Sequence, residues 1–376
     1  MIWENLLELF QAATFLTWKN LAMMVVACVL IYLAIVKDYE PVLLLPIGFG
    51  AILTNLPLTG ITDPEQHGLL ALLMDAGIRT ELFPLLIFIG IGALTDFGPL
   101  LENPRMAFLG AAGQIGIFGT LMLALALGFD LNESASIGII GAIDGPTAIY
   151  VSSKLAPHLL GPIAVAAYSY MSMVPIIQPP IMRLLTTEAE RKVRMPYTQR
   201  EVGKTVRVLF PIVVTIVVSL LSPKASPLIA TLMFGNLMRE SGVVEKLSKS
   251  AQNEIANVTT IFLGLAIGST MTGESFIQRD TLLILAMGLL AFFLDTAGGV
   301  LFGKLMYVLS RKKFNPLIGA AGISAFPMSA RIVQRVGQED DFENFLLMHA
   351  MGANTAGQLG SVVAGGVVLA LLAGII

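Results

Sequence analysis

Long runs of apolar residues alternate with short polar segments along almost the whole chain. The runs cover residues 20–36, 41–58, 82–97, 106–129, 134–152, 159–185, 206–222, 225–238, 259–273, 281–308, 316–333 and 344–376. A helix needs about 20 apolar residues to cross a bilayer, whereas the alternating strands of about ten residues that build membrane barrels are not seen. We therefore expect an all-α polytopic membrane protein with about 11–12 hydrophobic segments.

The two largest polar features lie at the N-terminus and between the halves of the chain. Residues 1–20 carry Glu4 and Glu8 where a signal peptide carries positive charge, so we expect an interfacial amphipathic helix there. Residues 21–376 should then form a single transmembrane domain. The loop 183–207 contains Arg183, Arg191, Lys192, Arg194, Arg200, Lys204 and Arg207. The positive-inside tendency puts this loop in the cytoplasm, and a substrate-docking patch is the alternative interpretation.

The second half of the sequence repeats the first in outline. Ile137, Gly138, Gly141 and Pro146 recur with the same spacing as Ile318, Gly319, Gly322 and Pro327. We therefore expect two structural repeats, at about 41–180 and 226–372. Proline removes a backbone donor and clashes with the preceding helical turn, so each repeat should contain a broken helix at mid-membrane. Paired broken helices favour an inverted repeat, and a parallel repeat is the alternative.

One carboxylate lies deep inside an apolar run. Asp144 stands between Gly141 and Pro146, where inserting a charged group costs about 2.5–3.5 kcal/mol. A bound cation, a proton, or an ion pair with Lys154 or Arg331 would each offset this cost. Sodium is a hard cation that prefers carboxylate, carbonyl and hydroxyl oxygens, and a broken helix beside a carboxylate offers them.

Neutral polar residues gather in the segments that should face this carboxylate. They are Asn315 and Ser324 around the second kink, Asn354 and Gln358 in the last segment, and Tyr168, Tyr170 and Gln178 in the sixth. Each of these alone is more often a helix-packing contact than a ligand, but together they predict an ion site. Gln114 and Asp295, at equivalent repeat positions, are weaker candidates.

Composition excludes several classes of function. Hydrophobic residues make up 55% of the chain and charged residues 13%, which leaves little room for a soluble catalytic domain. The 23 Lys and Arg are balanced by 26 Asp and Glu, so nucleic acid is not an expected partner. The single cysteine, Cys28, excludes an internal disulfide. The sequence contains no phosphate loop, His/Glu metal motif or serine-hydrolase elbow.

Three runs of sequence resemble a known family. They are GAIDGPTAIYVSSKLAPHLLGPIAVAAYSYMSMVPIIQPPIMRLL, NPLIGAAGISAFPMSARIVQ and HAMGANTAGQLGSVVAGG. These runs resemble the membrane beta subunit of biotin-dependent sodium-translocating decarboxylases, which act on oxaloacetate, glutaconyl-CoA, methylmalonyl-CoA or malonate. The resemblance implies that the chain receives carboxybiotin from a partner, releases carbon dioxide with consumption of a proton, and moves sodium outward.

The resemblance also implies roles for individual residues. The sodium ligands are Asp144, Asn315, Gly319, Ser324 and Asn354, and the catalytic residues are Asp144, Tyr170, Ser324 and Arg331. Tyr168 is the alternative to Tyr170. Arg331 should receive carboxybiotin, because a guanidinium matches a carboxylate with two hydrogen bonds. Arg335 is a competitor for that role, and a structural role for Arg331 is also open.

The implied partners are biotin carrier and carboxyltransferase subunits and a small membrane subunit, in the cytoplasmic membrane. Its lipid surrounds the chain, and a homo-oligomer is left open. The chain has no lysine-centred attachment motif such as Met-Lys-Met, so the cofactors are sodium and a carboxybiotin carried by the partner. From the residues alone, the rival is a stand-alone sodium/proton antiporter or a sodium-coupled organic-anion symporter. A passive scaffold fits the buried carboxylate poorly.

Overall fold

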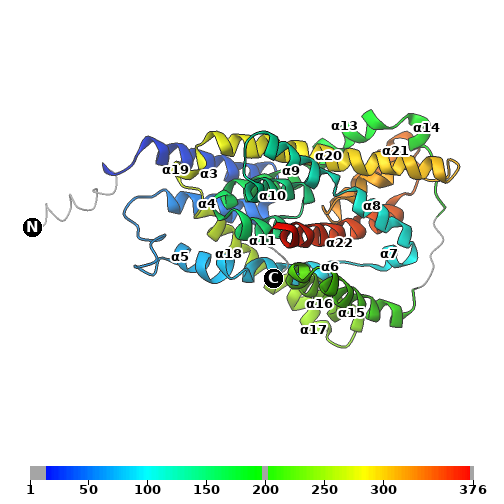
Figure 1. Cartoon of the computed structure of the whole chain (residues 1–376), viewed down its shortest axis with the longest axis horizontal. Coiled ribbons are helices and arrows are strands. Elements are labelled where there is room, and N and C mark those ends of the chain that lie inside the picture. The colour runs from blue at the N-terminus through cyan, green and yellow to red at the C-terminus, as the bar shows by residue number, and fades with distance from the viewer. Residues whose placement is uncertain (1–13, 197–201, 373–376) are drawn as a thin grey trace, which may run out of the picture.

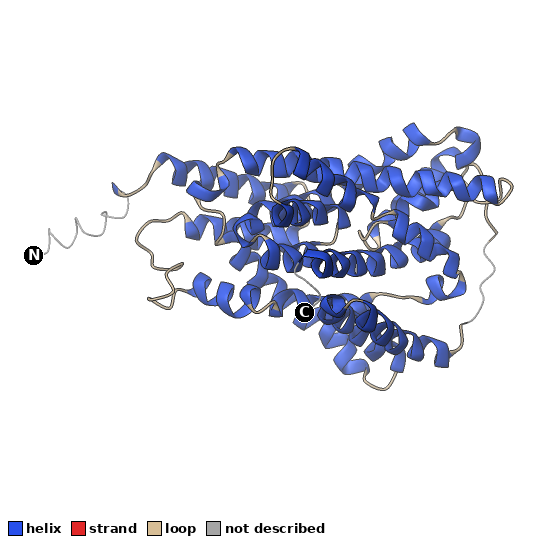
Figure 2. Ribbon diagram, viewed as in Figure 1, coloured by secondary structure: helices blue, strands red, loops and turns tan. Residues whose placement is uncertain are grey.

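The computed structural model describes residues 14–196 and 202–372, and within these ranges all regular elements are helices (Figure 2). The first half contains α3 (Trp18–Val36), α4 (Pro41–Thr54), α5 (Leu69–Leu73), η1 (Met74–Arg79), α6 (Leu82–Leu94), α7 (Gly98–Glu102), η2 (Pro104–Met106), α8 (Ala107–Ala112), α9 (Ile115–Ala126), α10 (Leu131–Gly138), η3 (Ile139–Ala142), α11 (Gly145–Leu155), η4 (Pro157–Leu159), α12 (Leu160–Ser172), α13 (Val174–Leu185) and α14 (Glu188–Arg191). The second half contains α15 (Lys204–Leu221), η5 (Pro223–Ala225), α16 (Ser226–Ser241), α17 (Glu245–Ser250), η6 (Ala251–Ile255), α18 (Ala256–Gly268), α19 (Gly273–Phe276), α20 (Arg279–Leu309), η7 (Pro316–Gly322), α21 (Met328–Asp340) and α22 (Leu347–Leu372).

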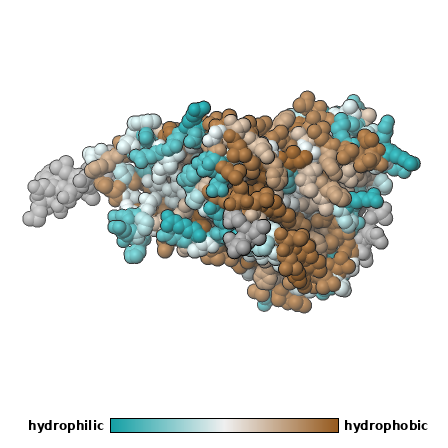
Figure 3. Space-filling model, viewed as in Figure 1, coloured by the Kyte–Doolittle hydropathy of each residue, from teal (hydrophilic) through white to brown (hydrophobic). Residues whose placement is uncertain are grey.

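The helical membrane fold expected from the sequence is confirmed. By length and apolar composition, five of the described helices can cross a membrane, or up to seven if each of two bent helix pairs counts as one span. The other apolar runs form shorter or broken helices, because prolines and glycines interrupt them. The helices run mainly along the long axis in Figure 1, and hydrophobic residues cover much of the middle of the surface in Figure 3.

Two expectations about organisation, the N-terminal helix and the inverted repeat, stay predictions. Residues 1–13 of the N-terminal helix expected over 1–20 lie outside the described residues, and Trp18 already begins α3. The inverted relation of the two repeats stays a prediction.

The buried apolar side chains form two large clusters, one centred on α3, α4 and α18 and the other on the segments around α20 and α22.

Both segments that were expected to break are broken. In the first, α10 gives way to the 3-10 turn η3, Ile143 adopts a left-handed backbone (φ 52°), and α11 starts at Gly145 with Pro146 in its first turn. In the second, the 3-10 turn η7 ends at Gly322, and α21 starts only at Met328. Proline suits a first helical turn because a backbone N–H there would have no intrahelical partner, so the helix loses no hydrogen bond when proline lacks this donor.

Glycines let backbones meet where the broken segments pack. A Cβ on Gly319 would collide with the carbonyl of Gly299 in α20, and one on Gly357 in α22 would collide with the carbonyl of Gly322. Side chains at these positions would push the segments apart. Gly319 was predicted to join the sodium site; in the structure it allows η7 and α20 to pack closely.

The basic loop is held by acidic residues near the C-terminal end of α21. Arg183 pairs with Glu339, Arg191 Nε lies 2.5 Å from Asp340, and Arg194 contacts Asp341 at 2.6 Å and Glu343 at 2.7 Å. These pairs neutralise much of the loop within the molecule, which fits the topogenic interpretation better than a free docking patch for anions.

Asp341→Asn tests this clamp. Hydrogen bonds from Arg194 hold the pKa of the Asp341 carboxyl below its ordinary value, so the carboxylate stabilises the fold at neutral pH and this contribution disappears as pH falls through the folded-state pKa. We expect the melting temperature of the variant to be only a few degrees lower at pH 7, because exposed ion pairs contribute little to the free energy of unfolding. Thermal melts at pH 7 and near pH 3 measure the difference; a gap that persists in acid would contradict this origin.

Candidate functional site

Asp144 caps the helix that follows the first break. Its Oδ2 accepts hydrogen bonds from Thr147 Oγ1 (2.8 Å), Gln358 Nε2 (3.0 Å) and Ser361 Oγ (3.0 Å), while Oδ1 accepts only a long contact from the Thr147 N–H (3.5 Å). The side chain is 4% exposed. One oxygen is thus saturated by neutral donors, and the other keeps lone pairs free.

The last helix, α22, ties the two broken segments together. It runs through the middle of the molecule (Figure 1) and contacts η7 and α11. Gln358 and Ser361 reach Asp144 on the first break, while Asn354 Nδ2 donates to the Ile323 carbonyl on the second (2.7 Å). Ser324 Oγ in turn donates to the Gly357 carbonyl of α22 (3.0 Å). Sequence segments far apart therefore meet around one helix.

Two contributors to this arrangement were not singled out from the sequence. Thr147 follows Asp144 at the spacing of a helix cap, and Ser361 follows Asn354 and Gln358 at positions i, i+4 and i+7 of a helix. Both spacings were visible signals, since i, i+4 and i+7 share one helical face.

A cavity of about 430 Å³ lies beside Asp144. Its wall combines the first break (Ile143, Asp144, Gly145, Pro146), the second break (Ser324, Phe326, Pro327), Gln358, and residues from α4, α6, α12 and α18, with Glu40 ahead of α4. Leu43 and Ile87 belong to one apolar cluster and Ile143 to the other, so the cavity lies where the clusters meet. Among the described residues that line it, none is Lys, Arg or His.

The ion-pair explanation for Asp144 does not hold in the described residues. Lys154 pairs with Glu81 (2.7 Å) and lies over the Tyr150 ring. Arg331 is exposed on α21, and its guanidinium makes no hydrogen bond or ion pair with residues 14–196 or 202–372. Arg335, one turn further, pairs with Glu339 at 3.8 Å and donates to the Pro175 carbonyl at 3.4 Å.

The two tyrosines of α12 point to different places. Tyr168 lines the cavity, is 1% exposed and packs its ring on Gly145, where a Cβ would collide with it. Tyr170 instead donates its hydroxyl to the Leu285 carbonyl of α20 at 2.5 Å, and it does not line the cavity. The catalytic role predicted for Tyr170 is not tested by this geometry, but direct contact with the cavity belongs to Tyr168.

Asn315 is not brought to Asp144. Its Nδ2 donates to the Arg191 and Val193 carbonyls at 2.8 Å each, and its Oδ1 accepts from the Leu317 N–H at 3.0 Å. The side chain anchors the basic loop to the start of η7. Its predicted role as a sodium ligand therefore has no support from proximity to the carboxylate.

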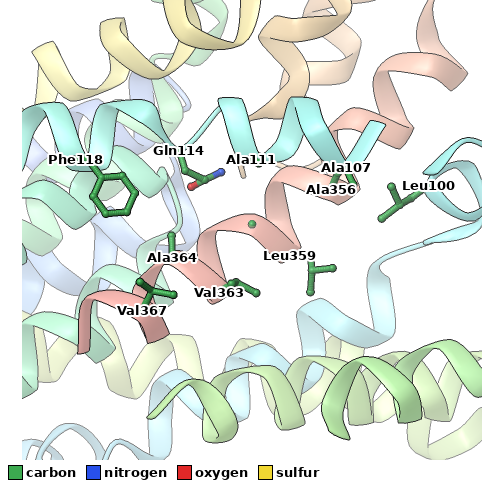
Figure 4. Close-up of a pocket in the computed structure, with 11 residues that line it drawn as sticks. Leu100, Ala107, Ala111, Gln114, Phe118, Ala356, Leu359, Val363, Ala364 and Val367 are labelled. Atoms are coloured by element: carbon green, nitrogen blue, oxygen red, sulfur yellow. The ribbon is translucent and has the colours of Figure 1, made fainter. Parts of the chain in front are cut away.

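The weaker candidates also lie apart from the cavity. Asp295 Oδ1 accepts the Gly116 N–H at the start of α9 (2.5 Å). Gln114 lines a second pocket of about 350 Å³, where residues of α8 and α9 face residues of α22 across the opening (Figure 4). Gln114 is the single polar residue among the described residues that line this pocket. The pocket therefore lacks the several oxygen ligands that an ion site needs.

Comparison with known proteins identifies the family. The family described as the Na+-transporting oxaloacetate decarboxylase beta subunit matches residues 19–372. The glutaconyl-CoA decarboxylase subunit beta of Acidaminococcus fermentans is 56% identical, over 95% of this chain and 94% of that protein. The methylmalonyl-CoA decarboxylase subunit beta of Propionigenium modestum is 52% identical, over 98% and 99%.

A third relative extends the range of named activities. The oxaloacetate decarboxylase beta chain of Klebsiella pneumoniae is 49% identical, over 92% of this chain and 94% of that protein. These relatives carry three different substrate names although each aligns over nearly its whole length. The resemblance seen in the sequence is confirmed: this multi-pass membrane chain belongs to the beta-subunit family of sodium-transporting decarboxylases.

Proposed function

We propose that this chain is the membrane subunit of a biotin-dependent sodium pump in the cytoplasmic membrane. It decarboxylates carboxybiotin delivered by a carrier on a partner subunit, and it couples this reaction to sodium export. A carboxyltransferase subunit selects the acid, and a small membrane subunit completes the complex. The observation that carries this proposal is Asp144, a buried carboxylate that lines a cavity. One of its oxygens accepts only a long contact from the Thr147 N–H, and no cationic side chain within residues 14–196 and 202–372 pairs with it.

The free oxygen of Asp144 suits a site that alternates between sodium and a proton. Ser324 Oγ lines the same cavity and has lone pairs left after it donates to Gly357. Asn354 does not line this cavity, but its Nδ2 bonds to the Ile323 carbonyl beside Ser324, and its buried Oδ1 has no hydrogen-bond partner in the described residues. A carboxylate with hydroxyl and amide oxygens suits a hard monovalent cation.

The proton is required by the reaction itself. Carboxybiotin carries its carboxylate on a ring nitrogen; the C–N bond breaks, carbon dioxide leaves, and the nitrogen takes up one proton to regenerate biotin. In this scheme Asp144 accepts sodium as its proton departs toward the reaction.

Tyr170 is proposed as the catalytic tyrosine from the family resemblance, whereas Tyr168 has the contact with the cavity. Substituting each tyrosine with Phe in turn shows which hydroxyl the reaction needs.

Arg331 is proposed to receive the carboxylated carrier. It is exposed and makes no pair with the described residues, whereas Arg335 is already engaged. We expect Arg331→Lys to lower turnover several-fold at limiting carrier, because an ammonium cannot form the paired hydrogen bonds of a guanidinium fork. The defect should shrink as carrier concentration rises, while sodium dependence is unchanged. Arg335→Lys is the matched control, and an equal defect in both variants would assign Arg331 to structure.

The decisive experiment isolates the native complex and reconstitutes it in liposomes. Biotinylated companions, carbon dioxide release and sodium uptake that depend on one another support the proposal, and the companion carboxyltransferase identifies the acid. The rival is an independent sodium/proton antiporter or organic-anion symporter. Sodium flux through the isolated chain, driven by a pH or anion gradient without any biotin carrier, would favour that rival and contradict the proposal.

A further inference from the structure

A groove of about 410 Å³ lies between the start of α8 and the end of α20. Its described lining residues are Arg105, Phe108, Phe302, Met306, Leu309 and Ser310. None of them lines the cavity beside Asp144, and the proposed function uses none of them. All but Arg105 and Ser310 are apolar, and Phe108 and Leu309 are mostly exposed. The groove therefore opens onto an apolar part of the molecular surface.

Arg105 is the charged residue of this groove, and its charge is not used inside the molecule. Its side chain is exposed, and within residues 14–196 and 202–372 its guanidinium makes no hydrogen bond or ion pair. It stands just before α8, where the positive end of the helix dipole disfavours a cation. An arginine at a membrane boundary often only extends towards water, but that role does not require an apolar groove beside it.

A basic turn, residues 311–313, continues the groove at the end of α20. Ser310 is followed directly by Arg311, Lys312 and Lys313, which are exposed and form no ion pair with the described residues. The Lys312 N–H donates to the Tyr307 carbonyl (2.8 Å), and this bond closes the last turn of α20. Ser310 Oγ donates to the same carbonyl (3.0 Å) and accepts the Lys313 N–H (3.2 Å). The hydroxyl is thus engaged, and the cations remain available to a ligand.

The groove lies at the end of the molecule that carries the basic loop. Lys304, on the same end of α20, donates to the Leu185 carbonyl at 3.1 Å and lies 3.4 Å from Glu190, beside the loop 183–207. The positive-inside tendency puts this loop in the cytoplasm. The cytoplasmic leaflet contains anionic lipids, and its negative surface potential attracts clustered lysines and arginines.

An apolar groove that ends in unpaired cations matches a lipid with a negatively charged headgroup. We propose that this groove binds an anionic glycerophospholipid of the cytoplasmic leaflet. An acyl chain lies along Phe108 and Phe302, and the phosphodiester lies against Arg105 and the basic turn, since a guanidinium can donate two hydrogen bonds to phosphate oxygens. Because α8 and α20 pack on each other and on η7 of the second break, a lipid between them stabilises that packing. The site goes beyond the proposed function, since it does not involve the pumped ion.

Lipid-dependent melting of the detergent-solubilised full chain and of the intact complex tests the site. We expect dioleoylphosphatidylglycerol, which is anionic, to raise the melting temperature saturably. Dioleoylphosphatidylcholine has the same acyl chains but no net charge, so it should have little effect. Arg105→Gln should raise the phosphatidylglycerol concentration for half-maximal stabilisation about fivefold, and adding Arg311→Gln should raise it by a similar factor again. The matched control is Lys204→Gln, which removes an exposed cation of the basic loop outside the groove and should change nothing.

Native mass spectrometry gives a readout that does not depend on melting. In an equimolar mixture of the two lipids, the unaltered chain should retain phosphatidylglycerol in preference to phosphatidylcholine. The variant with both Arg105→Gln and Arg311→Gln should lose this preference, and Lys204→Gln should keep it. If the double variant does not fold, the lipid preference of the unaltered chain and of Arg105→Gln alone decides the question.

Three results would overturn the lipid site. The first is equal stabilisation by both lipids, or an unchanged phosphatidylglycerol response in the double variant. The second is equal stabilisation by inorganic phosphate at the same concentrations, which would make a soluble anion the ligand. The third is a response of the isolated chain that is absent from the intact complex, which would show that a companion subunit or a second copy covers the groove. None of these measurements uses carbon dioxide release or sodium flux, so they leave the proposed function to its own test.

Discussion

Asp144→Asn should abolish sodium-dependent decarboxylation while the protein stays folded. The amide keeps the volume of the carboxylate, and its oxygen can still accept the hydrogen bonds from Thr147, Gln358 and Ser361 that Oδ2 accepts. What is lost is the negative charge and the free second oxygen. Substitutions of outer-shell groups around a metal change affinity about 10–100-fold, so removing the charged ligand itself should lower the rate at least on the order of 100-fold.

The control is Asp295→Asn, which alters an equally buried carboxylate outside the cavity. Its amide oxygen can still accept the Gly116 N–H, so fold and sodium dependence should persist. Carbon dioxide release as a function of sodium, with thermal melts of both variants, provides the comparison. Near-normal sodium-stimulated release from Asp144→Asn would remove Asp144 from the ion site.

Competition between sodium and the proton gives the sign of the pH dependence. If both bind the free oxygen of Asp144, a lower pH means more protonated carboxyl and therefore a higher sodium concentration for half-maximal rate. The shift should be seen between pH 8 and pH 6 in the unaltered complex. If the sodium concentration for half-maximal rate is the same at both pH values, the proton does not compete with sodium at Asp144.

The sequence was sufficient for the features that depend on local chemistry. Gly141, Pro146, Gly322 and Pro327 predicted both helix breaks, because these residues act on the backbone of their own segment. The deep position of Asp144 in an apolar run identified it as a residue in need of a partner. Membrane helices likewise follow from apolar runs alone.

Features that depend on direction across the fold could not be read from spacing. Tyr168 and Tyr170 are two residues apart on α12, so they point to different faces, and only the packing on Gly145 shows which one reaches the cavity. Asn315 stands beside a predicted kink, yet its hydrogen bonds go to the basic loop. A one-dimensional pattern does not specify which of several neighbours a polar side chain meets.

Ser324→Ala should raise the sodium concentration for half-maximal rate about tenfold, which corresponds to about 1.4 kcal/mol of binding free energy. Ser324 lies on the second break and lines the same cavity as Asp144, and the hydrocarbon around it offers no replacement oxygen. The substitution removes the hydroxyl that donates to the Gly357 carbonyl, but this carbonyl keeps a long contact from Gln114 Nε2 (3.5 Å), so the local structure should survive. Ser324→Thr keeps the hydroxyl and should restore part of the affinity.

Asn354→Ala separates ion binding from packing at the same break. The change removes the unpartnered Oδ1, but it also removes the Nδ2 donor to the Ile323 carbonyl, which leaves a buried acceptor at a cost of about 1–3 kcal/mol. We therefore expect both a higher half-maximal sodium concentration and a lower melting temperature, whereas Ser324→Ala should show mainly the first effect. If both variants keep the normal sodium dependence and lose only rate at saturation, the two residues support the carboxybiotin pocket or the packing of α22, and the ion must bind to Asp144 through other oxygens of the break.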